Sequence, residues 1–198
     1  MISWESEEER ARWNRKYGEG SHTSLEPDPF LLEAYEEFVA PLFPAPGAAL
    51  DVAGGVGRHA IWLAQRGWQV TLVDISEVGT AKASENAAVA GVPLRVETAD
   101  LLTYNFGHEA YNLILVFFYL QRELFSRMAA ALKPGGLIVY KTYTREHQNF
   151  ARFGLQHPMF FLEPNELLHA FPGLHVLHYR ETLREKGVAE LVAWKEPS

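Results

Sequence analysis

The sequence predicts an α/β fold: a doubly wound, mostly parallel sheet of seven strands with an antiparallel strand pair at its C-terminal edge. Through the middle of the chain, continuously apolar segments alternate with helical patterns. That alternation is typical of a parallel sheet that helices cover on both faces. Near the C-terminus, two extended segments, 174–183 and 188–195, flank the letters REKG, which indicate a hairpin turn.

The N-terminal part of the chain predicts two helices around a loop. Residues 5–16 are mostly charged, and residues 18–29 are rich in glycine, serine and proline, as loops are. A second helical pattern follows, which we expect Pro41 and the prolines after it to end. We therefore divide the single predicted domain into a helical segment, residues 1–45, and an α/β core, residues 46–198.

The core predicts its elements in regular alternation. Ser76 is suited to cap the second core helix, and Gly91 to stop it. The letters KPGG, residues 133–136, predict a tight turn before the fifth strand. The expected strands cover residues 48–52, 68–74, 93–100, 111–118 and 137–143, and the expected helices 57–66, 76–90 and 121–132.

Composition excludes several classes of protein. A length of 198 residues, with 47% hydrophobic and 22% charged residues, suits one soluble globular domain. The absence of cysteine excludes disulfides, cysteine-ligated metals and a thiol nucleophile within this chain. The longest apolar run, Leu113–Leu120, has 8 residues, whereas a membrane span needs about 20. The acidic N-terminus MISWESEEER is no secretory signal, so we expect a cytoplasmic protein without a membrane partner.

Charge and histidine spacing bear on the partners. The net charge of −7 favours a small-molecule substrate over RNA or DNA, since nucleic-acid binding depends on lysine and arginine. His175 and His178 lie on a predicted strand at an odd spacing, so they point to opposite faces and form no ligand pair. We predict no metal site, and the sequence does not indicate the oligomeric state.

A strand, a glycine loop and a helix follow one another in LDVAGGVGRHA, residues 50–60, which makes the expected fold Rossmann-like. Two cofactor classes use this device, dinucleotides and S-adenosylmethionine. The letters GVGRHA satisfy the dinucleotide pattern G-x-G-x-x-A. Asp51, however, directly precedes the loop, where its carboxylate would repel a pyrophosphate and attract the ammonium group of a methionine moiety.

Two more acids end the next two predicted strands, Asp74 and Asp100. Ligands bind at the carboxyl ends of strands in such sheets. Asp74 is placed to bind ribose hydroxyls, and Asp100 to accept a hydrogen bond from an adenine amino group. The alternative is that all three acids are solvated turn residues or helix caps. Their occurrence at successive strand ends around a glycine loop favours S-adenosylmethionine.

At this point the chain resembles a known family. Residues 51–57, DVAGGVG, resemble the D-x-G-x-G-x-G motif of class I S-adenosylmethionine-dependent methyltransferases, and residues 73–76, 98–100 and 132–136 resemble that family's later motifs. Residues 13–31 are similar to the small bacterial branch that includes tellurite-resistance and thiopurine-type methyltransferases.

The resemblance implies a set of cofactor-binding residues and an N-terminal helical lid that carries the first two of them. Asp51 and the loop would hold the methionine end, and Asp74 would bind the ribose hydroxyls. Ile75, Asp100 and Leu101 would contact the adenine. Phe117 would line the space near the reactive methyl. These residues are Trp13, Tyr17, Asp51, Ala53, Gly55, Gly57, Asp74, Ile75, Asp100, Leu101 and Phe117.

The chain departs from the family in three places that matter. Ala53 stands where the family has its first glycine, Tyr119 where the branch often has histidine, and Lys141 where it usually has an acid. Tyr119 and His157 are the candidates for a catalytic base, should one be needed. Arg58 and Lys141 would attract an anionic substrate or, alternatively, form ordinary surface pairs.

The predicted function is S-adenosylmethionine-dependent methyl transfer to a small-molecule acceptor, such as a thiol or a metalloid oxyanion. A non-catalytic S-adenosylmethionine-binding module is the alternative, and an NAD-dependent oxidoreductase is a third reading.

Overall fold

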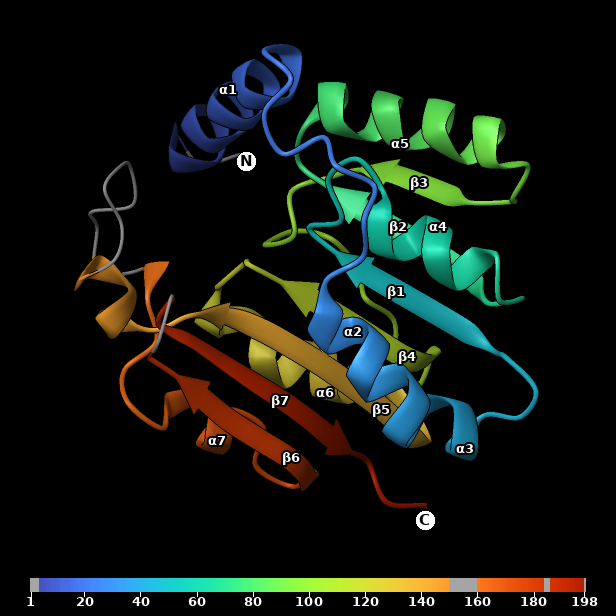
Figure 1. Ribbon diagram of the computed structural model, residues 1–198, viewed down its shortest axis with the longest axis vertical. Coiled ribbons are helices and arrows are strands. Elements are labelled where there is room, and N and C mark those ends of the chain that lie inside the picture. The colour runs from blue at the N-terminus through green and yellow to red at the C-terminus, as the bar shows by residue number, and fades with distance from the viewer. Residues whose placement is uncertain (1–3, 150–159, 184–185, 198) are drawn as a thin grey trace.

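A computed structural model describes residues 4–149, 160–183 and 186–197 of the chain. The described strands form one seven-stranded sheet in the order β3-β2-β1-β4-β5-β7-β6 (Figure 1). Strand β7 runs antiparallel between β5 and β6, and the other pairings are parallel. The strands are β1 Ala48–Val52, β2 Gln69–Asp74, β3 Arg95–Thr98, β4 Tyr111–Phe117, β5 Leu132–Tyr143, β6 His175–Thr182 and β7 Val188–Trp194. The predicted fold class, with its C-terminal antiparallel pair, is confirmed.

Helices cover both faces of this sheet (Figure 1). They are α1 Trp4–Gly18, α2 Pro29–Ala34, η1 Tyr35–Val39, α3 Ala40–Leu42, α4 Arg58–Ala64, α5 Glu77–Ala90, η2 Arg122–Leu124, α6 Phe125–Ala131, η3 Arg145–Asn149 and α7 Glu166–His169. Because side chains alternate along a strand, neighbouring residues of β1 enter different core layers. Ala49 packs with α2, α4 and α5, whereas Leu50 packs with α6 and α7.

Three expectations about local structure need correction. The helix that begins at Pro29 passes Pro41 and ends at Leu42, before Pro44, so the prolines end it as expected, but Pro41 itself lies inside the helix. The turn before it is a π-helix, in which Ala40 donates its N–H to the Tyr35 carbonyl. We attribute the tolerance of Pro41 to this wider turn, since a proline ring clashes with the carbonyl four residues before it in an ordinary α-helix.

Strand β3 is shorter than expected, and the predicted turn at residues 133–136 lies inside β5. Gly135, with φ +79°, sits where the register between β4 and β5 shifts, so the glycine pair forms an irregularity of the strand and not its start. The short helix α7 was not predicted. No helix in the described ranges combines the length and the apolar character that crossing a bilayer requires.

Candidate functional site

The loop between β1 and α4 places its backbone in conformations that favour glycine. Gly55 and Gly57 have φ of +56° and +88°. A Cβ on Gly54 would lie 2.6 Å from the Leu72 side chain, and one on Gly55 would lie 2.4 Å from the Tyr17 hydroxyl. Ala53 has φ +55° as well, in the left-handed region that strains an alanine. The residue that departs from the family motif therefore carries strain at the loop's first turn.

Asp51 lies beneath this loop and is 1% exposed. Its Oδ2 accepts the Ala60 N–H at 3.2 Å. Burial raises the pKa of Asp51 to about 7, and the strongest influence in the opposite direction is the Arg58 guanidinium. Burial disfavours a charged carboxylate. An arriving cation would favour it, so Asp51 is suited to ionise as it takes a positively charged group.

Asp74, at the end of β2, joins the glycine loop to the start of α5. Its two oxygens accept the N–H groups of Gly55 and Ser76, each at 2.9 Å. The side chain is 5% exposed, and burial raises its pKa. A carboxylate oxygen has two lone pairs. Both oxygens of Asp74 therefore keep capacity for a further donor such as a ribose hydroxyl.

Asp100 follows β3 and is half-buried. Its Oδ1 accepts the Leu102 N–H at 2.9 Å, and its Oδ2 accepts the Ser6 hydroxyl of α1 at 2.6 Å. Ile75, next to the ribose-side acid, is partly buried, while Leu101 is buried in the core layer that also contains α6. The three acids that the sequence singled out thus lie at the ends of three adjacent strands.

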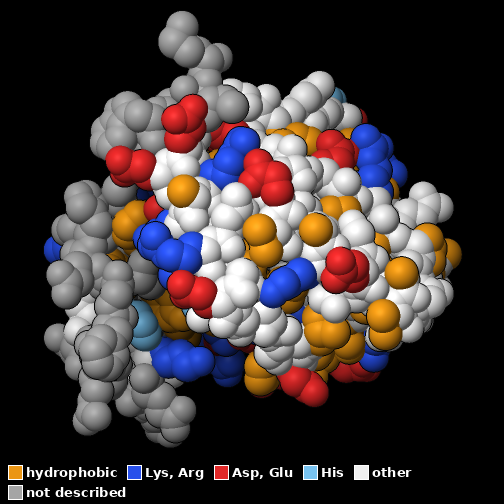
Figure 2. All heavy atoms as spheres, turned by 90° about the horizontal axis from the view of Figure 1, so that it is seen from above, with side chains coloured by type: hydrophobic (Ala, Val, Ile, Leu, Met, Phe, Trp, Pro, Cys, Tyr) orange, Lys and Arg blue, Asp and Glu red, His pale blue; other side chains and the backbone are white. Residues whose placement is uncertain are grey.

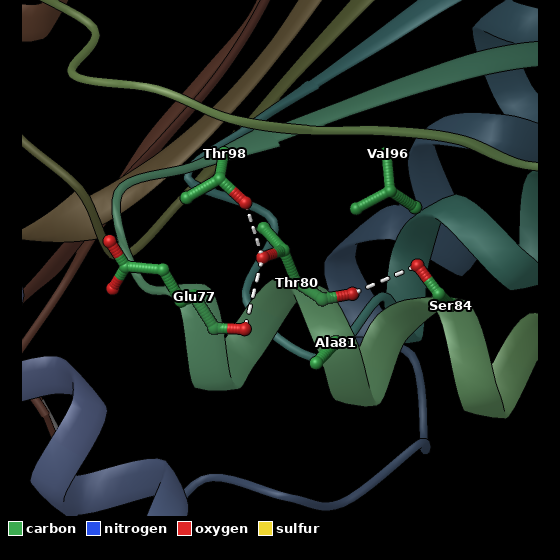
Figure 3. Close-up of a pocket in the computed structure, with 6 residues that line it drawn as sticks. All are labelled: Glu77, Thr80, Ala81, Ser84, Val96 and Thr98. Carbon is green, nitrogen blue, oxygen red and sulfur yellow. Dashed lines mark hydrogen bonds between the residues drawn. The ribbon is translucent and has the colours of Figure 1, made fainter.

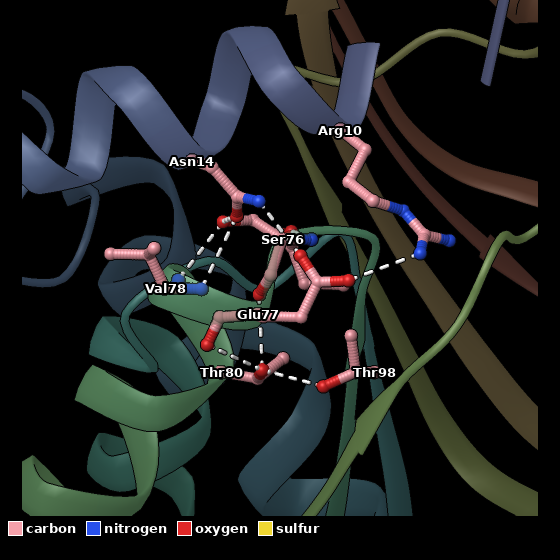
Figure 4. Close-up of polar contacts among 9 residues, drawn as sticks. Arg10, Asn14, Ser76, Glu77, Val78, Thr80 and Thr98 are labelled. Carbon is pink, nitrogen blue, oxygen red and sulfur yellow. Dashed lines mark hydrogen bonds and ion pairs between the residues drawn. The ribbon is translucent and has the colours of Figure 1, made fainter. Parts of the chain in front are cut away.

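Helix α1 docks on the first turn of α5 through polar contacts (Figure 4). The Asn14 amide oxygen accepts the Ser76 hydroxyl at 2.6 Å and the Val78 N–H at 3.3 Å. Glu77 accepts from Asn14 at 2.7 Å and pairs with Arg10 at 3.0 Å. Asn14 is the largest of the influences that lower the pKa of Glu77. The cap of α5 therefore also anchors the N-terminal helix.

Tyr17 closes the loop from above. It is 6% exposed, and its ring lies against both Gly55 and Gly79, where added Cβ atoms would collide with it. Trp13 stacks on Tyr17 with ring centroids 5.5 Å apart. Lys82 donates a hydrogen bond to the Tyr17 carbonyl. Of the two aromatic residues expected in the N-terminal segment, Tyr17 thus lies at the glycine loop, and Trp13 stacks on Tyr17.

The ends of β4 and β5 carry aromatic rings. The ring of Phe117 packs in the core, 4.2 Å from His59 between ring centroids. The next residue, Phe118, has a φ of +58°. Its ring centroid lies 4.9 Å from that of Tyr143 and 5.8 Å from Cζ of the Arg58 guanidinium. The sequence-based candidate at this strand end is Phe117 and not Phe118, because nothing in the letters VFFY separates the two rings. A bulky residue with positive φ is a strained feature typical of functional sites.

Lys141 belongs to a buried ionic network. Its Nζ lies 2.8 Å from Asp28 and 3.1 Å from Glu190. Glu190 also pairs with Arg180 at 2.7 Å. The Asp28 N–H donates to Nε2 of His59 at 3.3 Å, and burial lowers the pKa of His59, which keeps this nitrogen an acceptor. Lys141 thus pairs within the protein, but its pairs are buried and are not the ordinary surface pairs of the sequence-based alternative.

Of the two catalytic candidates, His157 lies outside the described residues. Tyr119 is partly buried, and its carbonyl accepts the Tyr140 hydroxyl at 2.8 Å. Burial raises the pKa of Tyr119, and Asp100 is the next contributor. A phenol with a raised pKa stays protonated at neutral pH. Tyr119 is therefore suited to donate a hydrogen bond and poorly suited to act as a base.

A shallow hollow lies beside this region, between α5 and β3 (Figure 3). The Thr80 and Thr98 hydroxyls are 2.6 Å apart, and the Ser84 hydroxyl donates to the Thr80 carbonyl at 3.1 Å. These hydroxyls therefore have hydrogen-bond partners within the protein. On the face shown in Figure 2, acidic and basic side chains are interspersed.

Comparisons with known proteins agree with this arrangement. Residues 49–136 match the family model described as a methyltransferase domain. Hemagglutinin 1 of Eikenella corrodens is 30% identical over 70% of this chain and 47% of its own length. The ribosomal RNA small subunit methyltransferase C of Alcanivorax borkumensis is 30% identical over 47% of this chain and 31% of its own length. The chain thus spans less than half the length of these two curated relatives.

The fold is also that of a solved methyltransferase. Magnesium protoporphyrin IX methyltransferase of Synechocystis PCC 6803, solved with bound SAH, has a TM-score of 0.70 at 17% identity, covering 96% of this chain and 99% of that one. Residues 49–136, which contain the glycine loop and its three acids, thus match a methyltransferase domain, and the chain has the fold of a solved methyltransferase.

Proposed function

We propose that the protein transfers the methyl group of S-adenosylmethionine to a small nucleophile, a thiol or a metalloid oxyanion. The observation that supports this best is the set of Asp51, Asp74 and Asp100, which surround the glycine loop at adjacent strand ends beneath α1. The cofactor supplies the activated methyl group, and the protein must bind and orient it and exclude water.

Each part of the site has a proposed task. Asp51 and the loop residues Ala53, Gly55 and Gly57 hold the methionine end, where a buried acid with a pKa of about 7 suits an ammonium group. Asp74 accepts the ribose hydroxyls with its remaining lone pairs.

The adenine and the lid complete the proposed site. Asp100 accepts from the adenine amino group, between Ile75 and Leu101. Tyr17 and Trp13 form the underside of a lid, held on α5 by the Asn14 contacts. Lids of this kind exclude water during the reaction.

The acceptor lies, in this proposal, against Phe118 and Tyr143 at the ends of β4 and β5. A thiolate or a metalloid oxyanion is a sufficient nucleophile without a general base, which fits a Tyr119 whose raised pKa keeps it protonated. The interspersed charges of Figure 2 and the net charge of −7 favour a small molecule over a nucleic acid.

The test is a pair of measurements on the purified protein. Calorimetric titration with S-adenosylmethionine is expected to give saturable heat, and titration with NAD none. Incubation with thiol, selenol, tellurite and phenol acceptors, followed by mass spectrometry, is expected to give a methylated thiol or metalloid product. Binding of NAD without binding of S-adenosylmethionine would refute the cofactor assignment.

A non-catalytic cofactor-binding module is the second candidate. The observation that favours it is Ala53, since strain in the loop that holds the methionine end departs from the family pattern. Saturable cofactor binding with no product from any acceptor of the panel would favour this module over the enzyme.

A further inference from the structure

The guanidinium of Arg127, on α6, binds the backbone of the segment that follows Asp100. Its Nη1 donates hydrogen bonds to the carbonyls of Leu101 at 3.2 Å and of Leu102 at 2.8 Å. Its Nη2 donates to the carbonyl of Tyr104. Because a guanidinium carries its donors in one rigid plane, these bonds hold the three carbonyls in a fixed arrangement beyond the end of β3.

The N–H groups of the same segment bond to Asp100. Oδ1 of Asp100 accepts the Leu102 N–H at 2.9 Å. The main-chain carbonyl of Asp100 accepts the N–H groups of Thr103 at 3.1 Å and of Tyr104 at 2.9 Å. The segment is therefore held from two sides, with its N–H groups on Asp100 and its carbonyls on Arg127.

Two peptide units of the segment are held at both ends. The unit between Leu101 and Leu102 has its carbonyl on Arg127 and its N–H on Oδ1 of Asp100. The next unit, between Leu102 and Thr103, has its carbonyl on Arg127 and its N–H on the Asp100 carbonyl. A peptide unit is a rigid plane, so its carbonyl and its N–H turn together. Arg127 therefore fixes the direction of the N–H that holds the Asp100 carboxylate.

The Asp100 carboxylate keeps capacity for a further donor. Its Oδ2 accepts the Ser6 hydroxyl at 2.6 Å, and each carboxylate oxygen has two lone pairs. The strength of a hydrogen bond depends steeply on its angle. A carboxylate that turned freely would therefore select weakly for an amino group at one position, and a fixed carboxylate selects strongly.

We propose that Arg127 is a positioning residue for recognition of the adenine base. This rests on the proposed function, in which Asp100 accepts a hydrogen bond from the adenine amino group. Arg127 acts through the peptide unit between Leu101 and Leu102 and keeps the Asp100 carboxylate aimed at that amino group. Selection of the base thus depends on α6 as well as on the strand ends.

A purely stabilising role is the competing explanation. The Arg127 guanidinium also lies 4.9 Å from the centroid of the Phe106 ring, which is 3% exposed. Loss of packing at this ring lowers the free energy of unfolding without favouring one ligand over another. Base selectivity is therefore the measurement that separates the two explanations.

The experiment compares S-adenosylhomocysteine with its purine analogue, in which hydrogen replaces the 6-amino group. In calorimetry on the full chain, we expect the wild type to bind S-adenosylhomocysteine about tenfold more tightly than the analogue, or better. Arg127→Met keeps an apolar side chain against Phe106 and loses all donors. It is expected to weaken S-adenosylhomocysteine binding about tenfold and analogue binding by less than about twofold, so that the preference disappears.

Arg127→Lys and Arg66→Met are the matched variants. Arg127→Lys keeps the charge without the planar fork, and we expect its preference to lie between those of Arg127→Met and the wild type. Arg66 also donates to a main-chain carbonyl, that of Trp62 at 3.1 Å, and its guanidinium carbon lies 3.5 Å from the Trp62 ring centroid. Because Arg66 follows the end of α4 that is farther from the glycine loop, Arg66→Met is expected to leave both affinities unchanged.

Each outcome decides for or against the positioning role. Circular dichroism and thermal melting check the fold of every variant, and Arg127→Lys provides a folded substitution if Arg127→Met unfolds. An unchanged preference in both Arg127 variants, or an equal loss of affinity for the two ligands, overturns the role of Arg127. A wild type that binds the two ligands equally overturns it as well, because Asp100 then does not select the amino group. If the wild type binds neither ligand, the proposed function fails, and this inference with it.

Discussion

The ends of β1, β2 and β3 and the ends of β4 and β5 hold their charged side chains in different ways. On the first side, each acid accepts a backbone N–H from nearby in the chain, nine residues away for Asp51 and two for Asp74 and Asp100. On the second side, Lys141 meets Asp28 across 113 residues of sequence. On the proposed cofactor side each acid thus has a backbone partner close in sequence, although Asp100 also accepts the Ser6 hydroxyl across 94 residues. On the proposed acceptor side the ion pairs of Lys141 join residues far apart in sequence.

The largest expected effect is on the long-range side. Lys141→Met leaves the buried carboxylate of Asp28 without its cation and leaves Glu190 with Arg180 alone. We expect a loss of about 3–5 kcal/mol of unfolding free energy, as for other broken buried pairs. Urea denaturation measures it. Arg95→Met, which breaks the exposed pair with Glu97, is the control and is expected to cost less than about 1 kcal/mol. Equal losses in the two variants would contradict the distinction.

The second effect tests the local side. Asp74→Ala removes the acceptor for the Gly55 and Ser76 N–H groups together with the proposed ribose contact. We expect affinity for S-adenosylmethionine to fall more than tenfold, about 1.4 kcal/mol, in a calorimetric titration. Asp74→Asn keeps one oxygen acceptor and is expected to lose less. An unchanged affinity in Asp74→Ala would remove this residue from the site.

The third effect follows from the pKa of about 7 that burial gives Asp51. Holding an ammonium group requires the ionised form. Cofactor affinity is therefore expected to fall about tenfold for each pH unit below 7. At pH 6, where Asp51 is mostly protonated, cofactor binding is expected to release a proton from Asp51 to solution. Titrations in buffers of different ionisation enthalpy measure this release, and Asp51→Asn should abolish it. A pH-independent affinity between 6 and 8 would count against the assignment.

The same pKa affects stability with the opposite trend. The unfolded carboxyl titrates near 3.8 and the folded one near 7, so the folded state binds more protons between these values, and the contribution of Asp51 to stability is lost as the pH rises through 7. Without cofactor, Asp51→Asn is expected to be more stable than the wild type at pH 8, by a margin that shrinks towards pH 5. Thermal melting across this range measures the margin.

The smallest effect concerns Ala53, with its φ of +55°. Ala53→Gly is expected to stabilise the protein by about 0.5–1 kcal/mol, because glycine adopts this conformation without strain and loses only part of that gain to its greater unfolded-state freedom. Ala49→Gly, in the extended and buried β1, is the control and should destabilise. Destabilisation by both substitutions would show that the Ala53 methyl contributes more through packing than it costs in strain.

Much of the cofactor side was predictable, because its information is local. A strand, three glycines, a helix and an acid at each strand end are visible as letters, and the structure places Asp51, Asp74 and Asp100 at adjacent strand ends as expected. Local propensity was less informative at two places. Pro41 lies inside a helix, after a π-helical turn. Gly135 and Gly136 form an irregularity within β5 and not the turn that was predicted. Those outcomes depend on packing against the sheet.

The sequence by itself determined that the central strands run parallel, and it determined the glycine loop and the acids that surround it, since each is encoded within a few neighbouring positions. Only the tertiary structure decided which of two similar cations is paired. The sequence gives Lys141 and Arg58 the same two interpretations. The carboxylates that pair with Lys141 belong to Asp28 and Glu190, which come close to it only in the folded chain. The tertiary structure likewise decided that the ring of Phe118, and not that of Phe117, lies beside Arg58. The backbone has a positive φ at Phe118, where β4 ends.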